Sequence, residues 1–278
     1  RMAVGKDSAV HIYSGGKWVK ETSIPQILGG RDRYGVWGAN ISSVDTFYVT
    51  GRQVSSVSAI YRCVLQISGS FSCSKHSGVV NDNFIGLFFG TKSATGGQGP
   101  LWAATTFPNQ PEDIYYNDGA STTWSRSSPQ GCQDSGGTPC SNTSGESFSL
   151  HGSSSSDVWL VGSDGLIIRY DGSKWTRISS AFPYQSSNKI RGVYSSAKDK
   201  LTLVVSDSNY NTTLGHRVQV FSYHHGLDKW FGPIVLRKSG FNIQDQLNDI
   251  GGMDLSNLWM VGQIRSGGRN KAWMVTFK

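Results

Sequence analysis

Short runs of hydrophobic residues, bounded by glycine, serine, asparagine or aspartate, follow one another along the whole chain. A run that alternates between apolar and small or polar residues, or that stays apolar over about six residues, is typical of a β-strand. One stretch holds four such runs in succession: SFSLHG (147–152), DVWLVG (157–162), LIIRYDG (166–172) and KWTRIS (174–179).

Each of these runs predicts a different place in one antiparallel sheet. The first alternates small and apolar residues, as an inner strand in a crowded centre should. The second is apolar almost throughout, which suits a strand buried between two neighbouring sheets. The third ends in an Asp-Gly turn that reverses the chain. The fourth begins at Lys174-Trp175 and becomes polar, as an outer edge strand does.

This four-strand unit is repeated along the chain. Residues 158–175 align without a gap with residues 1–18, and residues 150–162 align in the same way with residues 250–262. Weaker copies of the unit occur at 36–51, 87–105 and 193–207. A repeat of this kind, with four short strands in each copy, predicts a β-propeller, in which every copy forms one blade.

A tryptophan closes most copies of the unit, after a turn rich in glycine and aspartate. The separations between the closing tryptophans are 106, 51 and 55 residues, and Phe71 stands where one of them is missing. We expect each ring to cap its blade and to pack on the next one, because a single four-stranded sheet cannot bury both of its faces. The closing residues are Trp18, Trp124, Trp175 and Trp230.

We therefore predict an all-β protein with one β-propeller domain over residues 1–278. Counting gives twenty-two strands, with strands two to four of one unit at 1–24 and strands one to three of another at 245–278. Six four-stranded blades are the favoured number, five or seven remain alternatives, and the two ends of the chain are expected to share the closure. The internal blades are expected at 34–78, 79–128, 145–180 and 187–236.

The phrase SSSSDVWLVGSDGLIIRYDGSKW, at residues 153–175, resembles secreted bacterial propeller repeats of the form WGSSxxDVWxVGxxGxIxxYDGxxW. Those repeats are relatives of the Asp-box or BNR-type blades. The resemblance is close over 145–178, good over 1–18 and 249–262, and faint elsewhere. It implies a propeller on an extracellular or surface protein and specifies no reaction. The turn at 171–175 is shorter than the strict Asp-box, Ser-x-Asp-x-Gly-x-x-Trp.

The four cysteines form two close pairs, without the CxxC spacing or the histidine neighbours of a metal site. Two local disulfides, Cys63 with Cys73 and Cys132 with Cys140, are preferred to free thiols. Disulfides place the chain in an oxidising compartment, outside the cell, on its surface or in a periplasm. No apolar run approaches the roughly 20 residues that span a bilayer, so no membrane insertion is expected.

The chain carries 26 Lys and Arg against 19 Asp and Glu, a formal net charge of +7. Such an excess attracts acidic glycans or other anionic partners. Nucleic acid is the weakest of these partners, because the chain has no basic block and no nucleic-acid-reading motif. The basic residues gather in segments expected on one propeller face, where they would bind an acidic glycan or a protein partner. The alternative is that these loops are polar only because they are in water. The predicted ligand-binding residues are Lys6, Arg31, Arg33, Arg52, Arg265 and Arg269.

Catalytic patterns are scarce. A glycosidase needs two carboxylates facing each other, but the chain has only three glutamates, and several aspartates are taken by turns. There is no Gly-x-Ser-x-Gly elbow, and Arg191 is the only arginine clearly placed for an inner ring. His151 is expected to pack, and His224-His225 to lie in a solvated turn. The prediction is no enzyme, no cofactor and no metal.

The leading function predicted from the sequence is a non-catalytic binding or adhesion module that recognises carbohydrate or a protein partner. The second alternative is a structural subunit of a surface filament, which would self-associate through the edge strands of incomplete terminal blades. The third is a glycan-cleaving hydrolase.

Overall fold

The computed structural model shows a chain built almost entirely from β-strands. Within the described residues, one short 3-10 helix, η2 (His225–Leu227), accompanies twenty-two strands. The chain divides into two compact units, Arg1–Ser128 and Pro129–Lys278. The structure describes residues 2–4, 10–14, 17–20, 36–41, 44–52, 58–77, 85–92, 98–105, 114–127, 147–163, 165–178, 189–197, 202–207, 218–235, 246–252, 258–266 and 269–277.

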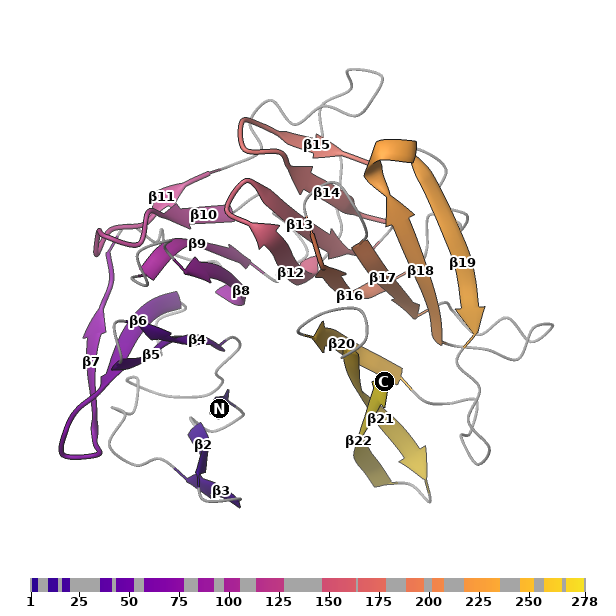
Figure 1. Ribbon diagram of the computed structural model, residues 1–278. Coiled ribbons are helices and arrows are strands. Elements are labelled where there is room, and N and C mark those ends of the chain that lie inside the picture. Colours follow the sequence, from indigo (N-terminus) through magenta and orange to yellow (C-terminus); the bar gives the residue numbers. More distant parts are fainter. Residues whose placement is uncertain are drawn as a thin grey trace. The chain divides into compact units, whose positions relative to one another are not determined.

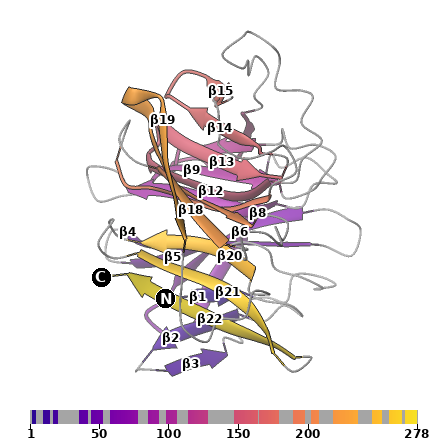
Figure 2. The same ribbon diagram turned by 90° about the vertical axis from the view of Figure 1, so that its right-hand side faces the viewer.

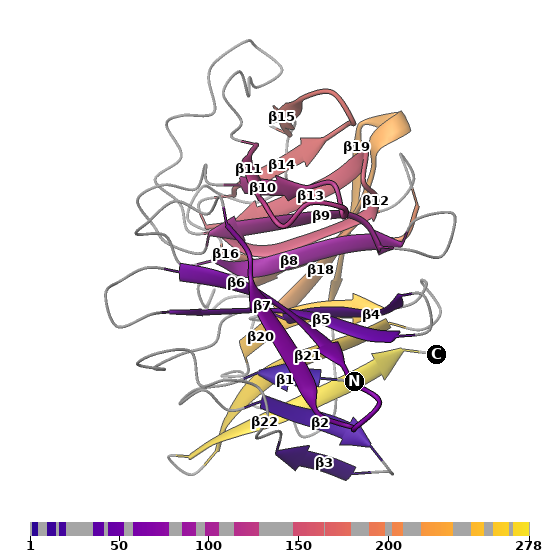
Figure 3. The ribbon, with the colours of Figure 1, turned by 90° about the vertical axis from the view of Figure 1, so that its left-hand side faces the viewer.

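The first unit contains three antiparallel sheets in its described part, and each follows the order of the chain (Figures 1 and 3). They are β1 (Met2–Val4), β2 (Val10–Ser14) and β3 (Lys17–Lys20); β4 (Val36–Ile41), β5 (Val44–Arg52), β6 (Ser58–Leu65) and β7 (Phe71–Lys75); and β8 (Ile85–Lys92), β9 (Gln98–Thr105), β10 (Ile114–Asn117) and β11 (Ser125–Arg126).

The second unit has the same organisation in its described part (Figure 2). Its sheets are β12 (Ser147–Ser154), β13 (Asp157–Gly162), β14 (Ile167–Tyr170) and β15 (Trp175–Arg177); β16 (Lys189–Ser195), β17 (Thr202–Asp207), β18 (Val218–His224) and β19 (Lys229–Val235); and β20 (Gln246–Gly252), β21 (Leu258–Ser266) and β22 (Arg269–Phe277).

The four strands predicted between residues 147 and 179 are confirmed, and so are the three-stranded sheets at the two ends of the chain. The sharing of a closure between those two sheets, and the single domain over 1–278, stay predictions. Among the described residues, no helix is both long enough and apolar enough to cross a membrane.

The core lies between neighbouring sheets, where the second strands are covered. All six residues of β13 are buried. On one face of β13, Trp159 and Val161 pack with Ile190 and Val193 of β16 and with Tyr223 of β18. This explains the nearly continuous apolar run in the sequence, because a strand covered on both faces needs apolar residues on both.

The first unit repeats this packing between its second and third sheets. Tyr48 of β5 and Ile60 of β6 share one apolar cluster with Leu101, Tyr115 and Trp124. The rings of Tyr48 and Trp124 meet edge to face at 6.5 Å. Trp124 therefore joins two sheets, as expected of a closing tryptophan. It packs against the preceding sheet, whereas the sequence predicted packing against the next one.

The closing tryptophans are not all alike. Trp124 and Trp175 are buried, whereas Trp18 is 50% exposed, and the capping role of Trp18 stays a prediction. Trp18 lies on β3, a strand whose four residues are all exposed. Phe71 is buried in β7, and its ring meets that of Phe47 at 5.6 Å, in the place predicted for the missing tryptophan.

Hydrogen bonds also join the outer edges of two sheets in the first unit. Ser77, after β7, forms an isolated parallel bridge with Thr123, in the turn before β11. The Ser77 N–H donates to the Thr122 carbonyl at 3.0 Å, and the Trp124 N–H donates to the Ser77 carbonyl at 2.9 Å. This edge-to-edge pairing adds backbone bonds to the apolar contact beneath it.

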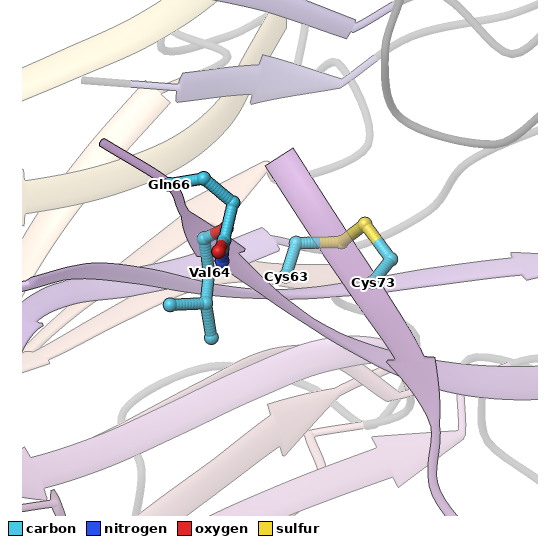
Figure 4. The surroundings of a disulfide bond; sticks show 4 residues. All are labelled: Cys63, Val64, Gln66 and Cys73. Atoms are coloured by element: carbon cyan, nitrogen blue, oxygen red, sulfur yellow. A yellow bond between two sulfur atoms is a disulfide. The ribbon is translucent and has the colours of Figure 1, made fainter. Parts of the chain in front are cut away.

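The predicted disulfide between Cys63 and Cys73 is present (Figure 4). The two residues lie directly opposite each other on β6 and β7, and their Cα atoms are 4.0 Å apart. Cys132 and Cys140 lie outside the described residues.

A buried ion pair joins Asp157, the first residue of β13, to Arg169 of β14. The Arg169 Nε–H donates to Asp157 Oδ1 at 2.8 Å, and both side chains are almost fully buried. Asp157 Oδ2 accepts hydrogen bonds from Ser153 at 2.6 Å and from Ser195 of the next sheet at 3.2 Å. The aspartate of the repeated DVW phrase therefore holds its own hairpin and links it to β16.

We expect Asp157→Ala to lower the free energy of unfolding by about 3–5 kcal/mol, because it leaves Arg169 buried without its carboxylate. Asp171→Ala is the matched control: that carboxylate is exposed and bonds only within its turn, so a loss of about 1 kcal/mol is expected. Urea unfolding followed by circular dichroism measures both. Equal losses would show that the buried pair has no special importance.

The turn between β14 and β15 depends on one aspartate and one glycine. Asp171 Oδ1 accepts hydrogen bonds from the Lys174 N–H and from the hydroxyl and N–H of Ser173, which lower the pKa of its carboxyl to about 2. Gly172 has a φ of +100°, and a Cβ placed on it would lie 2.8 Å from the Cβ of Ser156. Glycine is required there for both conformation and space.

Gly172→Ala is expected to destabilise the chain more than Gly69→Ala. Both glycines have a positive φ, which costs a substituted residue about 1–2 kcal/mol. A Cβ placed on Gly69 would meet no other atom within 4 Å, so only Gly172→Ala adds a steric clash. The urea midpoint of each variant tests this, and a midpoint for Gly172→Ala no lower than that for Gly69→Ala would contradict it.

Candidate functional site

The structure places the predicted basic residues only in part. Arg265 and Arg269 lie in one hairpin of the second unit, where Arg265 pairs with Asn270 and Arg269 with Ser266. Arg52, in the first unit, ends β5 opposite Ser58 of β6. Lys6, Arg31 and Arg33 lie outside the described residues.

Arg265 and Arg269 lie in the hairpin that joins β21 to β22. This hairpin lies at the end of the sheet where β20, its first strand, begins. Gln246, the first residue of β20, pairs with Gln263 of β21, so Arg265 follows two residues beyond that pair. The same pattern occurs in the preceding sheet, where Lys189 at the start of β16 pairs with Asp207 at the end of β17. Lys189 is exposed.

A β-bulge recurs near the start of each first strand in the second unit. Between Ser147 and Ser149 the partner strand advances by one residue instead of two, which leaves Phe148 as the extra residue. The same shift leaves Arg191 as the extra residue of β16 and Asn248 as that of β20. Bulges turn a side chain away from the alternation of its strand and are over-represented near binding sites. We call Phe148, Arg191 and Asn248 the bulge positions.

Two bulge positions meet in space because β12 and β16 run side by side and parallel. The Val193 N–H donates to Ser149 Oγ at 3.3 Å, and the Ser195 N–H donates to His151 Nδ1 at 3.2 Å, with the same separation of 44 residues in each pair. Arg191 Cζ lies 4.4 Å from the centre of the Phe148 ring. Figure 1 shows β12 and β16 as neighbours.

The arrangement can bind a polar ligand in two ways. A guanidinium stacked on a ring is attracted to its π face, and the planar guanidinium fork matches the geometry of a carboxylate. The Phe148 ring is itself partly exposed, so an apolar face lies beside the cation. An aromatic face next to charged donors suits sugars that carry a carboxylate.

Sequence reasoning considered Arg191 only as a member of an inner ring and did not select Phe148 or Asn248. The internal alignment of 150–162 with 250–262 places Phe148 and Asn248 at equivalent positions once it is extended by two residues. One position of the repeat therefore carries different residue types in different copies. This difference is the sequence signal that could have identified Phe148 and Asn248.

His151 has the packing role that the sequence predicted. Its ring lies 4.8 Å from that of Tyr194, and its Nδ1 accepts the Ser195 N–H. Burial lowers the pKa of His151 to about 4, although the charge of Asp157 acts in the opposite direction. The imidazole is therefore neutral at pH 7 and serves as a hydrogen-bond acceptor between two sheets.

The turn at His224-His225 differs from its expected solvated form. The His225 ring packs 6.5 Å from the Trp159 ring and 6.1 Å from the Tyr223 ring, and it is only partly exposed. Asp228, at the end of this turn, has a left-handed φ of 46° and accepts a hydrogen bond from the Tyr223 hydroxyl. Within the described parts of the chain, no three His, Cys, Asp or Glu side chains are grouped as metal ligands.

Comparison with known proteins shows the fold. No protein-family model and no curated protein matches the chain in sequence. It is similar in structure to the GH74 xyloglucanase of Xanthomonas campestris, with a TM-score of 0.60 and 9% identity, over 99% of this chain and 42% of that one. It is also similar to Aleuria aurantia lectin in complex with α-methyl-L-fucoside, with a TM-score of 0.58 and 8% identity, over 96% and 82%.

A third similar structure is YCF48 bound to D1 peptide, with a TM-score of 0.58 and 12% identity, over 95% of this chain and 71% of that one. These proteins are β-propellers, so the predicted fold class is confirmed. The predicted resemblance to a propeller repeat family is supported at the level of the fold. The proteins named here include a lectin with its sugar, a protein with its peptide and an enzyme.

The prediction that the chain is not an enzyme is contradicted. An exo-β-1,3-galactanase from Phanerochaete chrysosporium, which is an enzyme like the xyloglucanase, has a TM-score of 0.51 to the chain. The chain covers 65% of the length of this galactanase. The chain thus spans less than two thirds of both enzymes. The scarcity of glutamates, on which the exclusion rested, does not exclude an enzyme with this fold.

The neutral state of His151 predicts a pH dependence of stability. Its pKa is about 4 in the folded chain and about 6.5 when unfolded, so the unfolded chain binds the proton more tightly. The free energy of unfolding is therefore expected to fall as the pH drops from about 6.5 toward 4, by up to about 1.4 kcal/mol per pH unit from this group. His151→Asn keeps a hydrogen-bond acceptor and should show a shallower fall. Urea unfolding at several pH values tests this, and identical slopes would contradict it.

Proposed function

We propose that this chain is an extracellular or surface carbohydrate-recognition protein that binds acidic glycans at the bulge positions of its second unit. The observation that carries the proposal is the meeting of Arg191 and Phe148, which come from bulges at matching places in adjacent strands. Packing alone would not need a cation and an aromatic ring at two adjacent bulges, where the alternation of side chains between the two faces of the sheet is interrupted. The similarity to a lectin supports carbohydrate as the ligand class.

Charge supports the acidic character of the ligand. The chain has a formal net charge of +7, Lys189 is exposed at the start of β16, and Arg265 and Arg269 lie at the corresponding end of their own sheet. We propose that these cations of the second unit attract the polyanion, while Arg191 bonds a carboxylate directly. A role for Lys6, Arg31, Arg33 and Arg52 in ligand binding stays a prediction from the sequence. The Cys63–Cys73 disulfide supports an extracellular or surface location.

Calorimetric titration of the whole chain with polygalacturonate and with heparin tests the proposal. Arg191→Gln is expected to weaken binding about tenfold or more, since hydrogen bonds to charged groups contribute about 1.5–3 kcal/mol. Phe148→Ala should weaken it as well, by removing the ring that supports the guanidinium. Lys75→Gln is the matched control, because Lys75 is an exposed cation on β7 of the first unit.

The double variant Arg265→Ser/Arg269→Ser is expected to weaken binding mainly at low salt, because these cations act over a distance. Carboxyl-reduced polygalacturonate is the matched ligand control and should bind poorly to the wild-type chain. Unchanged affinity of Arg191→Gln for both polyanions, or an equal loss with Lys75→Gln, would refute the site.

Cleavage of a bound glycan is a second candidate function, because two structures similar to the chain are enzymes by name. The same titrations provide the test when the ligand is recovered and its length measured by chromatography. Shortened chains that appear with the wild type and not with Arg191→Gln would assign turnover to the same site.

A further inference from the structure

The bulges of the second unit occupy equivalent places in three neighbouring sheets. The residue after each bulge position pairs with a valine of the second strand, namely Val161, Val205 and Val261. β16 lies against β12, and β20 lies against β16 (Figure 1). The three bulge positions therefore follow one another across three adjacent first strands.

Three successive sheets extend farther than one sugar ring. Sheets that pack face to face lie about 10 Å apart, so the first and the third bulge positions are separated by two such steps. A ligand that contacts only Arg191 and Phe148 needs no more than one acidic sugar. A ligand that also reaches the sheet β20–β22 has to be a chain of several sugars.

Positive charge is concentrated in the third of these sheets. The described residues of β20, β21 and β22 include three cations, Arg265, Arg269 and Lys271, and one acidic residue, Asp249. Arg265 and Arg269 lie next to the β21–β22 turn, at the end of the sheet that also carries the bulge position Asn248. A net positive charge therefore lies at the end of the row of bulge positions.

The other two sheets offer less positive charge at this end. In the middle sheet, Lys189 stands opposite Asp207 in the register, so Asp207 offsets part of its charge, and Arg191 is the cation at the bulge. In the first sheet the bulge position is Phe148, and the described residues of the β13–β14 turn, 163 and 165–166, include no charged residue. Across the three sheets the chemistry therefore changes from an aromatic ring, to one guanidinium, to a cationic hairpin.

We propose, on the basis of the proposed function, that the second unit binds an internal stretch of a linear polyuronate laid across β12, β16 and β20. The ligand class is a chain with a carboxylate on successive sugars, rather than a glycan with one terminal acidic sugar. Phe148 contacts the face of one sugar, Arg191 bonds the carboxylate of the next, and the β21–β22 hairpin attracts carboxylates farther along the chain. Because linked groups bind in effect intramolecularly after the first one, affinity rises with length until the ligand spans the three sheets.

Calorimetric titration with galacturonate oligomers of increasing length tests the proposal. The whole chain is titrated at low salt with the monomer, the dimer, the tetramer and the octamer. The octamer is expected to bind about tenfold more tightly than the dimer, because it adds several exposed ion pairs, each of which contributes modestly. Arg191→Gln should weaken binding at every length, since its carboxylate contact is common to all of them.

Two double variants locate the origin of the length dependence. Arg265→Ser/Arg269→Ser is expected to weaken octamer binding about fivefold or more and dimer binding less than about twofold, because only the longer ligand reaches the hairpin. Lys174→Ser/Lys229→Ser is the matched control. It removes the same charge from two exposed lysines of the second unit, which the strand register places at the opposite end of their sheets from the bulges. It should leave the ratio of the two affinities unchanged.

Circular dichroism checks the folding of each variant. If the dimer binds as tightly as the octamer and Arg191→Gln weakens both, the ligand is a single acidic sugar: the polyuronate proposal is overturned and the proposed function stands. Equal effects of the two double variants on octamer binding would overturn it as well, because net charge alone would then explain the length dependence. Unchanged binding of every oligomer by Arg191→Gln would refute the proposed function and this proposal together.

Discussion

A twisted four-stranded sheet has two faces and can cover neither by itself, and this constraint governs the structure. The solution is lateral packing, in which the second strand of one sheet meets aromatic and β-branched residues of the next. Trp159 against Tyr223 and Tyr48 against Trp124 are two versions of that contact. On β3, where all four residues are exposed, the tryptophan is half exposed.

Close packing also decides which polar groups can lie inside. Asp157 lies at the start of a fully buried strand and satisfies its oxygens with Arg169, Ser153 and Ser195. His151 accepts a backbone N–H of the adjacent sheet. These bonds align β12 with β16, and that alignment brings Arg191 over Phe148. The apolar and polar contacts between sheets thus set the geometry of the proposed binding site, although none of their residues belongs to it.

Much of the fold could be predicted, because the repeat leaves a periodic trace in residue type: apolar second strands, Asp-Gly turns and closing tryptophans. The bulges left no such trace. Phe148, Arg191 and Asn248 have nothing chemical in common, and a bulge is a shift in pairing between two strands rather than a preference of one residue. Charge alone directed attention to loop arginines. The exclusion of an enzyme failed because a count of glutamates says little about a fold that enzymes also use.

A bulge residue stands outside the ladder of paired residues, and this has an evolutionary consequence. A mutation at residue 148, 191 or 248 exchanges a side chain without moving the register of any strand. The side chains at these three places can therefore change while the pairing of the surrounding strands is kept. Among homologues, these places should vary in identity between sequences whose surrounding strand residues remain constant.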